Sequence, residues 1–298
     1  MRRIVRRTLV MAVTVAVVAG CASAAQTQQS GAYAPSRFSV EVAGQGPDVI
    51  LIPGLASSRD VWDAALVQLS ATHRVHVLQL AGFAGEPTGV VSDGEVVHPF
   101  VHDLHRYIEA NRIVRPVVIG HSLGGLSALM LARHHPESVG RVMVVDALPF
   151  FSLLIDASAT EESMARQAAA ARDAMLAMSP EQFAAGQTVT MNRLVRTQAL
   201  RPAVVGWSLA SDRSVMARAM YEVMTTDLRG DLASIQTPVT IVYAYDPAMG
   251  PEPAITGLYT NLYAPLPNHH LVRIDQSYHF IPLDQPEAFA AAVDEFLR

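Results

Sequence analysis

The sequence predicts an α/β protein whose central sheet is mostly parallel and carries helices on both faces. Short runs of buried-type apolar residues alternate with segments of helical periodicity, and this alternation is typical of a parallel sheet. A Gly-x-Ser-x-Gly pattern lies between one of these strands and the helix that follows it. Half of the 298 residues are hydrophobic, so the core needs neither a disulfide nor a metal ion for stability.

Seven segments have the composition of strands. The first alternates apolar and polar residues, and the others are nearly continuous apolar runs, as expected for strands buried on both faces. They are residues 38–42, 49–52, 74–80, 117–119, 142–145, 239–243 and 271–274. Helical patterns lie between them at residues 60–69, 100–111, 123–135 and 286–297.

One long stretch interrupts the alternation of strands and helices. No strand pattern occurs between Asp146 and Pro238, and the sequence there is rich in alanine and methionine with helical periodicity. We therefore expect a helical cap over residues 148–236, inserted between the strand ending at Asp146 and the strand starting at Pro238. Flexible methionine side chains suit an adaptable apolar wall over an active site, and they equally suit packing of the insertion onto the core.

The N-terminus has the pattern of a secretory signal peptide over residues 1–21. Four arginines precede an uncharged apolar run of about 13 residues, which is shorter than the roughly 20 that span a membrane. Two interpretations of its end remain open. Residues 18–21 resemble a bacterial lipobox in which Cys21 is lipidated, whereas residues 22–25 suit ordinary signal peptidase cleavage. The polar residues 22–37 are predicted to be a flexible tether, so we expect an exported protein, either periplasmic or a membrane-anchored lipoprotein.

The charge balance argues against a nucleic-acid partner, and the spacing of the histidines does not indicate a metal site. The chain has 22 basic and 27 acidic residues, which argues against nucleic-acid binding because that requires a basic face. His98, His102 and His105 have helical spacing, but no acidic or cysteine partner completes a recognised ligand pattern. We expect these to be surface or groove residues, with no metal and no cofactor. His134 and His135 suit a helix end.

Gly120-His121-Ser122-Leu123-Gly124 is the pattern of a nucleophile elbow. Ser122 would sit at the tip of a sharp turn between a strand and a helix, with its hydroxyl exposed. Gly120 and Gly124 leave room for the backbone in that turn, and His121 is expected to buttress it. The first turn of the helix would place free N–H groups near a developing negative charge.

From these residues, the chain resembles the α/β-hydrolase family over residues 38–298. A Pro-Gly turn at residues 53–54 follows a strand, and Trp62 lies eight residues after Gly54, as in the oxyanion loop of that family. Residues 82–85 stand where the family has a glycine-rich loop. His279 lies shortly before a helix start at Pro286, and the order serine, acid, histidine is the order of the family.

The resemblance implies a role for each candidate site residue. Ser122 would be the nucleophile and His279 the base that activates it. Asp246, at the end of the sixth predicted strand, is the expected acid, and Asp146, at the end of the fifth, is the alternative. The backbone N–H groups of Leu55 and Leu123 would form the oxyanion hole, although Pro53 replaces the histidine that is common in this loop.

The expected function is hydrolysis of carboxylic esters through a Ser-His-Asp triad and an acyl-enzyme, without a cofactor. The expected substrate is a small ester-like molecule with an apolar acyl or alcohol group. Lactonase, amidase or peptidase, carbon–carbon hydrolase and perhydrolase activities use the same triad and stay open as alternatives. A binding protein with low turnover on the same fold is a further alternative, and the sequence leaves the oligomeric state open.

Overall fold

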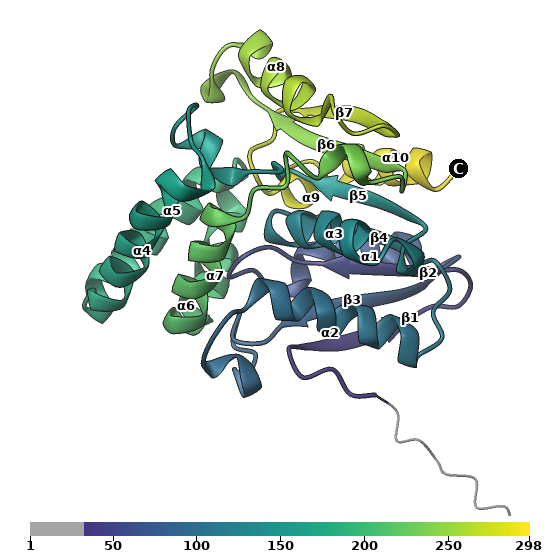
Figure 1. Ribbon diagram of the computed structural model, residues 1–298, viewed down its shortest axis with the longest axis horizontal. Helices are drawn as coiled ribbons and strands as arrows, with labels where there is room; N and C mark the ends of the chain where they lie inside the picture. The colour runs from purple at the N-terminus through teal and green to yellow at the C-terminus, as the bar shows by residue number, and fades with distance from the viewer. Residues whose placement is uncertain (1–32) are drawn as a thin grey trace, which may run out of the picture. The chain divides into compact units, whose positions relative to one another are not determined.

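The predicted fold class is confirmed by a computed structural model, which describes residues 33–298 (Figure 1). Seven strands form one sheet in the order β1-β3-β2-β4-β5-β6-β7. β1 pairs with β3 in the antiparallel sense, and every other pairing is parallel. The strands are β1 (Phe38–Ala43), β2 (Asp48–Ile52), β3 (Arg74–Leu80), β4 (Val117–His121), β5 (Arg141–Val145), β6 (Val239–Tyr245) and β7 (His269–Asp275).

Helices cover both faces of the sheet, because successive strand residues point to opposite sides. In β2, Ile50 and Ile52 belong to the apolar cluster that contains the buried residues of α2 and α3. Val49 and Leu51 belong to the other cluster, with α1 and α10. The helices of the sheet domain are α1 (Asp63–Leu69), α2 (Val97–Ala110), α3 (Leu123–His134), α8 (Glu252–Tyr263), α9 (Ile281–Asp284) and α10 (Pro286–Leu297).

The segment between β5 and β6 is helical, as predicted. Its helices are α4 (Glu161–Ala177), α5 (Pro180–Leu194), α6 (Arg201–Ala210) and α7 (Arg213–Thr225), with α4 packed on α7 and α5 on α6. The sequence analysis did not predict α6 or α8. Both are short and begin with a proline in their first turn, and each contains a glycine, which weakens the helical signal.

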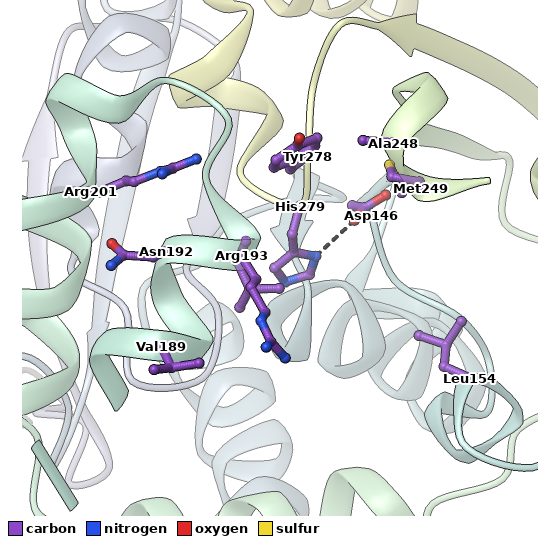
Figure 2. A pocket seen from close by; sticks show the side chains of 11 residues that line it. Asp146, Leu154, Val189, Asn192, Arg193, Arg201, Ala248, Met249, Tyr278 and His279 are labelled. Carbon is purple, nitrogen blue, oxygen red and sulfur yellow. Dashed lines mark hydrogen bonds and ion pairs between the residues drawn. The ribbon is translucent and has the colours of Figure 1, made fainter. Parts of the chain in front are cut away.

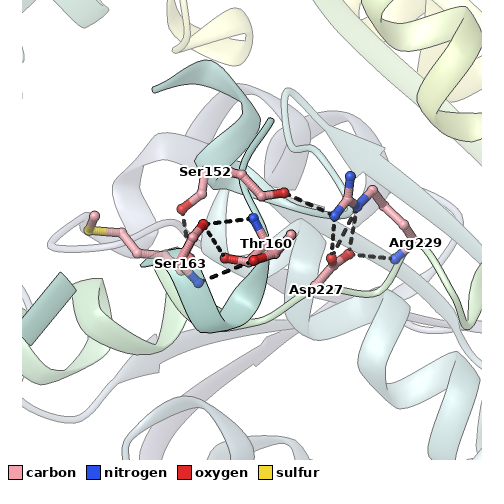
Figure 3. A network of polar contacts seen from close by, with 7 residues as sticks. Ser152, Thr160, Ser163, Asp227 and Arg229 are labelled. Atoms are coloured by element: carbon pink, nitrogen blue, oxygen red, sulfur yellow. Dashed lines mark hydrogen bonds and ion pairs between the residues drawn. The ribbon is translucent and has the colours of Figure 1, made fainter. Parts of the chain in front are cut away.

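A network of polar contacts fixes the start of the cap (Figure 3). The Thr160 side chain accepts a hydrogen bond from the Ser163 N–H, and Ser163 Oγ accepts one from the Thr160 N–H, so the two residues form a capping box for α4. Arg229 binds both carboxylate oxygens of Asp227 and reaches the Ala159 carbonyl. The chain segments entering and leaving the cap are thereby joined near its base.

The last residues of the predicted tether are docked on the domain. The Asp103 carboxylate of α2 accepts hydrogen bonds from the backbone N–H groups of Ser36, at 2.8 Å, and Arg37, at 2.9 Å. The Tyr33 hydroxyl donates to the same carboxylate. The prediction of a flexible tether is therefore wrong for residues 33–37, because a buried carboxylate on α2 needs these donors.

The predicted signal peptide, the lipobox with Cys21 and residues 22–32 of the tether lie outside the described residues. Among the helices of residues 33–298, none combines the length and the apolar character needed to cross a membrane.

Candidate active site

Ser122 occupies a strained turn between β4 and α3, as the elbow pattern predicts. Its backbone has φ 55° and ψ −120°, a region that L-residues rarely adopt. A Cβ atom on Gly120 would lie 2.1 Å from the Gly124 carbonyl oxygen, and one on Gly124 would lie 2.3 Å from the Ile52 carbonyl oxygen. Only glycine fits at these two positions, and their close backbone contacts hold the serine at the tip of the turn.

The partner of His279 is Asp146. His279 follows β7, and its Nδ1 lies 2.7 Å from Asp146 Oδ2 (Figure 2). The Tyr259 hydroxyl and the Ala244 N–H, each at 3.0 Å, donate to Asp146 Oδ1. Burial raises the pKa of this carboxyl, but the hydrogen bond and charge of His279, together with the Ala244 N–H, outweigh burial, so that the net pKa lies below its ordinary value. The carboxylate is therefore charged and held in place by three donors.

Asp246, the acid preferred in the sequence analysis, does not contact His279 and is corrected here to a structural role. Its Oδ2 accepts a hydrogen bond from Arg196 Nε at 2.7 Å, and its Oδ1 accepts one from the Ala248 N–H at 2.9 Å. The Ala248 N–H and the Arg196 guanidinium lower the pKa of Asp246. The charge of this carboxylate is thus used to hold Arg196, which lies in the linker between α5 and α6.

Ser122 and His279 line one cavity of about 380 Å³ between the sheet edge and the cap. Most of its wall is apolar, and much of that wall comes from the cap and from the loop after β5. These apolar residues include Leu148, Phe151, Met175, Met191, Met216, Met220 and Val223. The methionines at these positions therefore serve as cavity wall, one of the two roles expected for them.

A second, more open depression adjoins the cavity on the outer side of His279 (Figure 2). Its lining shares His279, Asp146, Leu154 and Leu194 with the cavity. The arginines of α5 and α6 that line it are Arg193 and Arg201. His279 and Asp146 therefore border both the apolar cavity and an open depression whose lining includes two arginines.

The two residues expected to form an oxyanion hole both line the cavity. Leu123 is the first residue of α3, so its N–H has no acceptor within the helix. Leu55 follows the Pro53-Gly54 turn, and this turn lies against the elbow: a Cβ on Gly124 would be 2.7 Å from the Pro53 carbonyl oxygen. Proline at position 53 is thus compatible with close contact between the loop and the elbow.

His121 supports the loop that carries His279. Its Nε2–H donates to the His279 carbonyl oxygen at 2.9 Å, and the two imidazole centres are 4.6 Å apart. Complete burial, with a smaller contribution from the charge of His279, lowers the pKa of His121 to about 3. His121 is therefore a neutral side chain that braces the histidine loop, in agreement with the buttress predicted for it.

A carboxylate that the sequence analysis did not single out joins the cap to the histidine loop. Asp284 accepts hydrogen bonds from the N–H groups of Arg196 at 3.0 Å and Thr197 at 2.8 Å in the cap linker. It also accepts one from Tyr278 at 3.0 Å. The Phe280 N–H donates to the Leu194 carbonyl oxygen at 3.2 Å. Because the contacts are to backbone N–H groups, no sequence motif identifies them.

A strained serine, a histidine paired with a buried carboxylate and an apolar cavity, all at the carboxyl edge of a parallel sheet, define a hydrolase with a nucleophile elbow. Comparison with known proteins agrees. The model of the alpha/beta hydrolase family matches residues 49–292, and the chain belongs to this family.

Among curated proteins, the chain is similar to the pimeloyl-[acyl-carrier protein] methyl ester esterase of Vibrio atlanticus. The two are 27% identical over 86% of this chain and 96% of the relative. The enzyme of the same name from Nitrosomonas europaea is 25% identical over 86% of this chain and 97% of the relative.

Solved structures show the same fold. A hydrolase from Pseudomonas aeruginosa superposes with a TM-score of 0.72 at 22% identity, covering 87% of this chain and 94% of that protein. An enol-lactonase from Burkholderia xenovorans superposes with a TM-score of 0.70 at 18% identity, covering 87% of this chain and 96% of that protein.

Proposed function

We propose that the protein is a serine esterase in which Ser122 is the nucleophile, His279 the general base and Asp146 the acid of the triad. The observation that carries this proposal is the 2.7 Å pair between His279 and Asp146 beside a cavity that Ser122 also lines. The similarity to methyl ester esterases supports the choice of an ester substrate.

The reaction that we propose uses each of these residues. Asp146 accepts the Nδ1–H of His279 and so leaves Nε2 free to take the proton of Ser122. Ser122 Oγ then attacks the acyl carbon, and the N–H groups of Leu55 and Leu123 stabilise the oxyanion. His279 returns the proton to the departing alcohol. Water, deprotonated by the same imidazole, releases the acid from the acyl-enzyme.

The cavity favours a substrate with an apolar acyl chain. Its wall of leucine, phenylalanine and methionine side chains offers few polar partners, and burial of a hydrocarbon chain there contributes about 0.8 kcal/mol for each methylene group. The similar curated enzymes are named as methyl ester esterases, and hydrolysis of a methyl ester fits an acyl chain in the cavity and a small alcohol.

Labelling with a fluorophosphonate probe tests the nucleophile. We expect wild-type protein and Ser234→Ala, a matched variant at an exposed serine, to be labelled equally, and Ser122→Ala to remain unlabelled. Hydrolysis of p-nitrophenyl esters of increasing acyl length then tests the reaction. Labelling that persists in Ser122→Ala, or absence of any ester hydrolysis by labelled protein, would contradict the proposal.

We also propose that the protein is exported and held at a membrane through a lipid on Cys21. Support comes from the arginine-rich start, the apolar run and the lipobox-like residues 18–21. Cys21→Ser is expected to move the enzyme from the membrane fraction to the soluble fraction of the cell envelope without changing its specific activity. An unchanged membrane fraction would show that Cys21 is not the anchor.

A further inference from the structure

Histidines from two helices meet on the surface of the sheet domain, outside the cavity that contains Ser122. His102 and His105 lie on one face of α2, and His135 follows the last residue of α3. The rings of His105 and His135 are nearly parallel, with centres 3.8 Å apart, and the ring of His102 lies across that of His135 at 5.4 Å. Glu137 follows in the short turn after α3.

These side chains place three metal-binding atoms close together. One donor atom each from His105, His135 and Glu137 lies within 4.8 Å of the other two. His135 Nδ1 is 3.7 Å from Glu137 Oε1. Ligands at the ~2.0–2.1 Å bond lengths of tetrahedral zinc are about 3.4 Å apart. The rings of His105 and His135, which are stacked here, must tilt for both donors to point at one ion.

Each of the two imidazoles is oriented by a neighbouring residue that contacts the ring nitrogen not used for metal binding. His105 Nδ1 is hydrogen-bonded to the buried Ser138 Oγ at 2.8 Å, and its Nε2 lies 3.3 Å from the exposed Glu109 carboxylate, a contact that an ion bound at Nε2 would replace. His135 Nε2 lies 3.4 Å from His102 Nδ1, which leaves Nδ1 toward Glu137. Metal-bound histidines usually donate their other N–H to such a partner.

The fold holds two of the three proposed ligands in place. The side chains of His105 and His135 are only 15% and 17% exposed, whereas that of Glu137 is 65% exposed. Two ligands are therefore held by the fold, and the third can swing in from solvent.

We propose that His105, His135 and Glu137 bind a divalent transition-metal ion of the zinc class, with His102 as the outer hydrogen-bond partner of His135. Two imidazoles and one carboxylate are the donor set that zinc prefers, and water completes the coordination. Because these residues join α2 to the end of α3, the bound ion stabilises the contact between the two helices and takes no part in ester hydrolysis.

Zinc titration by isothermal calorimetry tests this site. The protein is the full-length chain without a polyhistidine tag, treated with chelator and dialysed. We expect one ion per chain for wild type and an increase of the melting temperature on zinc addition. His135→Ala should abolish binding, and Glu137→Gln should weaken it at least 10-fold. His270→Ala, at an exposed histidine of β7, is the matched control and should bind as wild type does.

Glu137→Gln keeps the test valid if His135→Ala fails to fold, because Glu137 is an exposed side chain. Absence of stoichiometric zinc binding by the wild type would overturn the proposal. Wild-type affinity in Glu137→Gln and His135→Ala would do the same, as would an equal loss in His270→Ala, which would indicate nonspecific binding to surface histidines.

Discussion

His279 is hydrogen-bonded to Asp146 at the end of β5, and the carboxylate that ends β6, Asp246, is turned toward Arg196 instead. The two carboxylates end neighbouring parallel strands. Only the one held by Tyr259 and the Ala244 N–H points at the imidazole. The acid of the proposed triad is therefore assigned by these contacts.

Replacing Asp146 and Asp246 by asparagine, one at a time, should separate their roles. Asp146→Asn is expected to lower kcat by about 10⁴-fold, because the amide favours the wrong histidine tautomer. Asp246→Asn removes a charge from a different network, so kcat should fall less than about 10-fold. Steady-state kinetics on a p-nitrophenyl ester give both values. A larger loss of kcat in Asp246→Asn than in Asp146→Asn would identify Asp246 as the acid of the triad.

The glycines of the elbow should resist replacement. Gly120→Ala would place a Cβ 2.1 Å from the Gly124 carbonyl oxygen, and we expect a loss of more than about 2 kcal/mol in the free energy of unfolding. Gly257→Ala on α8 is the matched control, because nothing lies within 4 Å of its Cβ. It should stabilise the protein by up to about 1 kcal/mol. Urea denaturation measures both, and equal stabilities would contradict the described turn.

The backbone strain at Ser122 should be measurable as stability. With φ 55° and ψ −120°, Ser122→Gly removes the clash of the Cβ, whereas Ser122→Ala retains it. Both variants lack the hydroxyl and should be inactive. We expect the glycine variant to be more stable than the alanine variant by about 1 kcal/mol. A glycine variant that melts below the alanine variant would show that the turn is unstrained.

His121 should make the protein sensitive to acid. Its pKa is 6.5 in an ordinary setting and about 3 in the fold. As the pH falls from about 6.5, the unfolded chain binds a proton that the folded protein does not, so stability declines until the pH approaches 3. By about pH 4.5 this cost is on the order of 3 kcal/mol.

His121→Asn removes that titrating group, so its free energy of unfolding should depend less on pH between 4.5 and 7 than that of the wild type. The comparison uses slopes from urea titrations, which a general loss of stability from the substitution does not affect. His270→Asn, at an exposed position, should keep the wild-type slope. Identical slopes in wild type and His121→Asn would refute a neutral, buried imidazole.

The cavity wall should set the preferred acyl length. Met220 of α7 lines the cavity, whereas Met178 lies outside its lining and is 38% exposed. Met220→Trp fills space that a long chain would occupy. We expect the kcat/KM ratio of long to short p-nitrophenyl esters to fall by about 10-fold or more. Met178→Trp should leave the ratio unchanged, and a similar fall in both variants would mean that the cavity does not hold the acyl chain.

The sheet and the elbow could be predicted from the sequence because their signals are local. Apolar runs define the strands, and the glycine spacing around Ser122 predicts a turn that only glycine permits. The orientation of an acidic side chain at a strand end is not local. Asp146 is held by Tyr259, from a helix that the sequence pattern did not predict, and Asp246 is held by Arg196, fifty residues away in the chain.

The same limit applies to the histidines of α2. Their helical spacing was visible in the sequence, and so was the pair at positions 134 and 135. The contact between His105 and His135 depends on how α2 packs against the end of α3, and tertiary packing of that kind leaves no trace in residue spacing.

Asp284 gives the cap and the histidine loop a common anchor, since it binds the backbone on both sides. A displacement of the chain just after α5 would therefore also displace the backbone at Tyr278, the residue before His279. If a bulky ester entered by displacing this end of the cap, His279 would be moved out of its position before the reaction begins. We therefore expect any opening of the cap for substrate entry to occur at its opposite end, with the end anchored by Asp284 as the fixed pivot that keeps His279 in place.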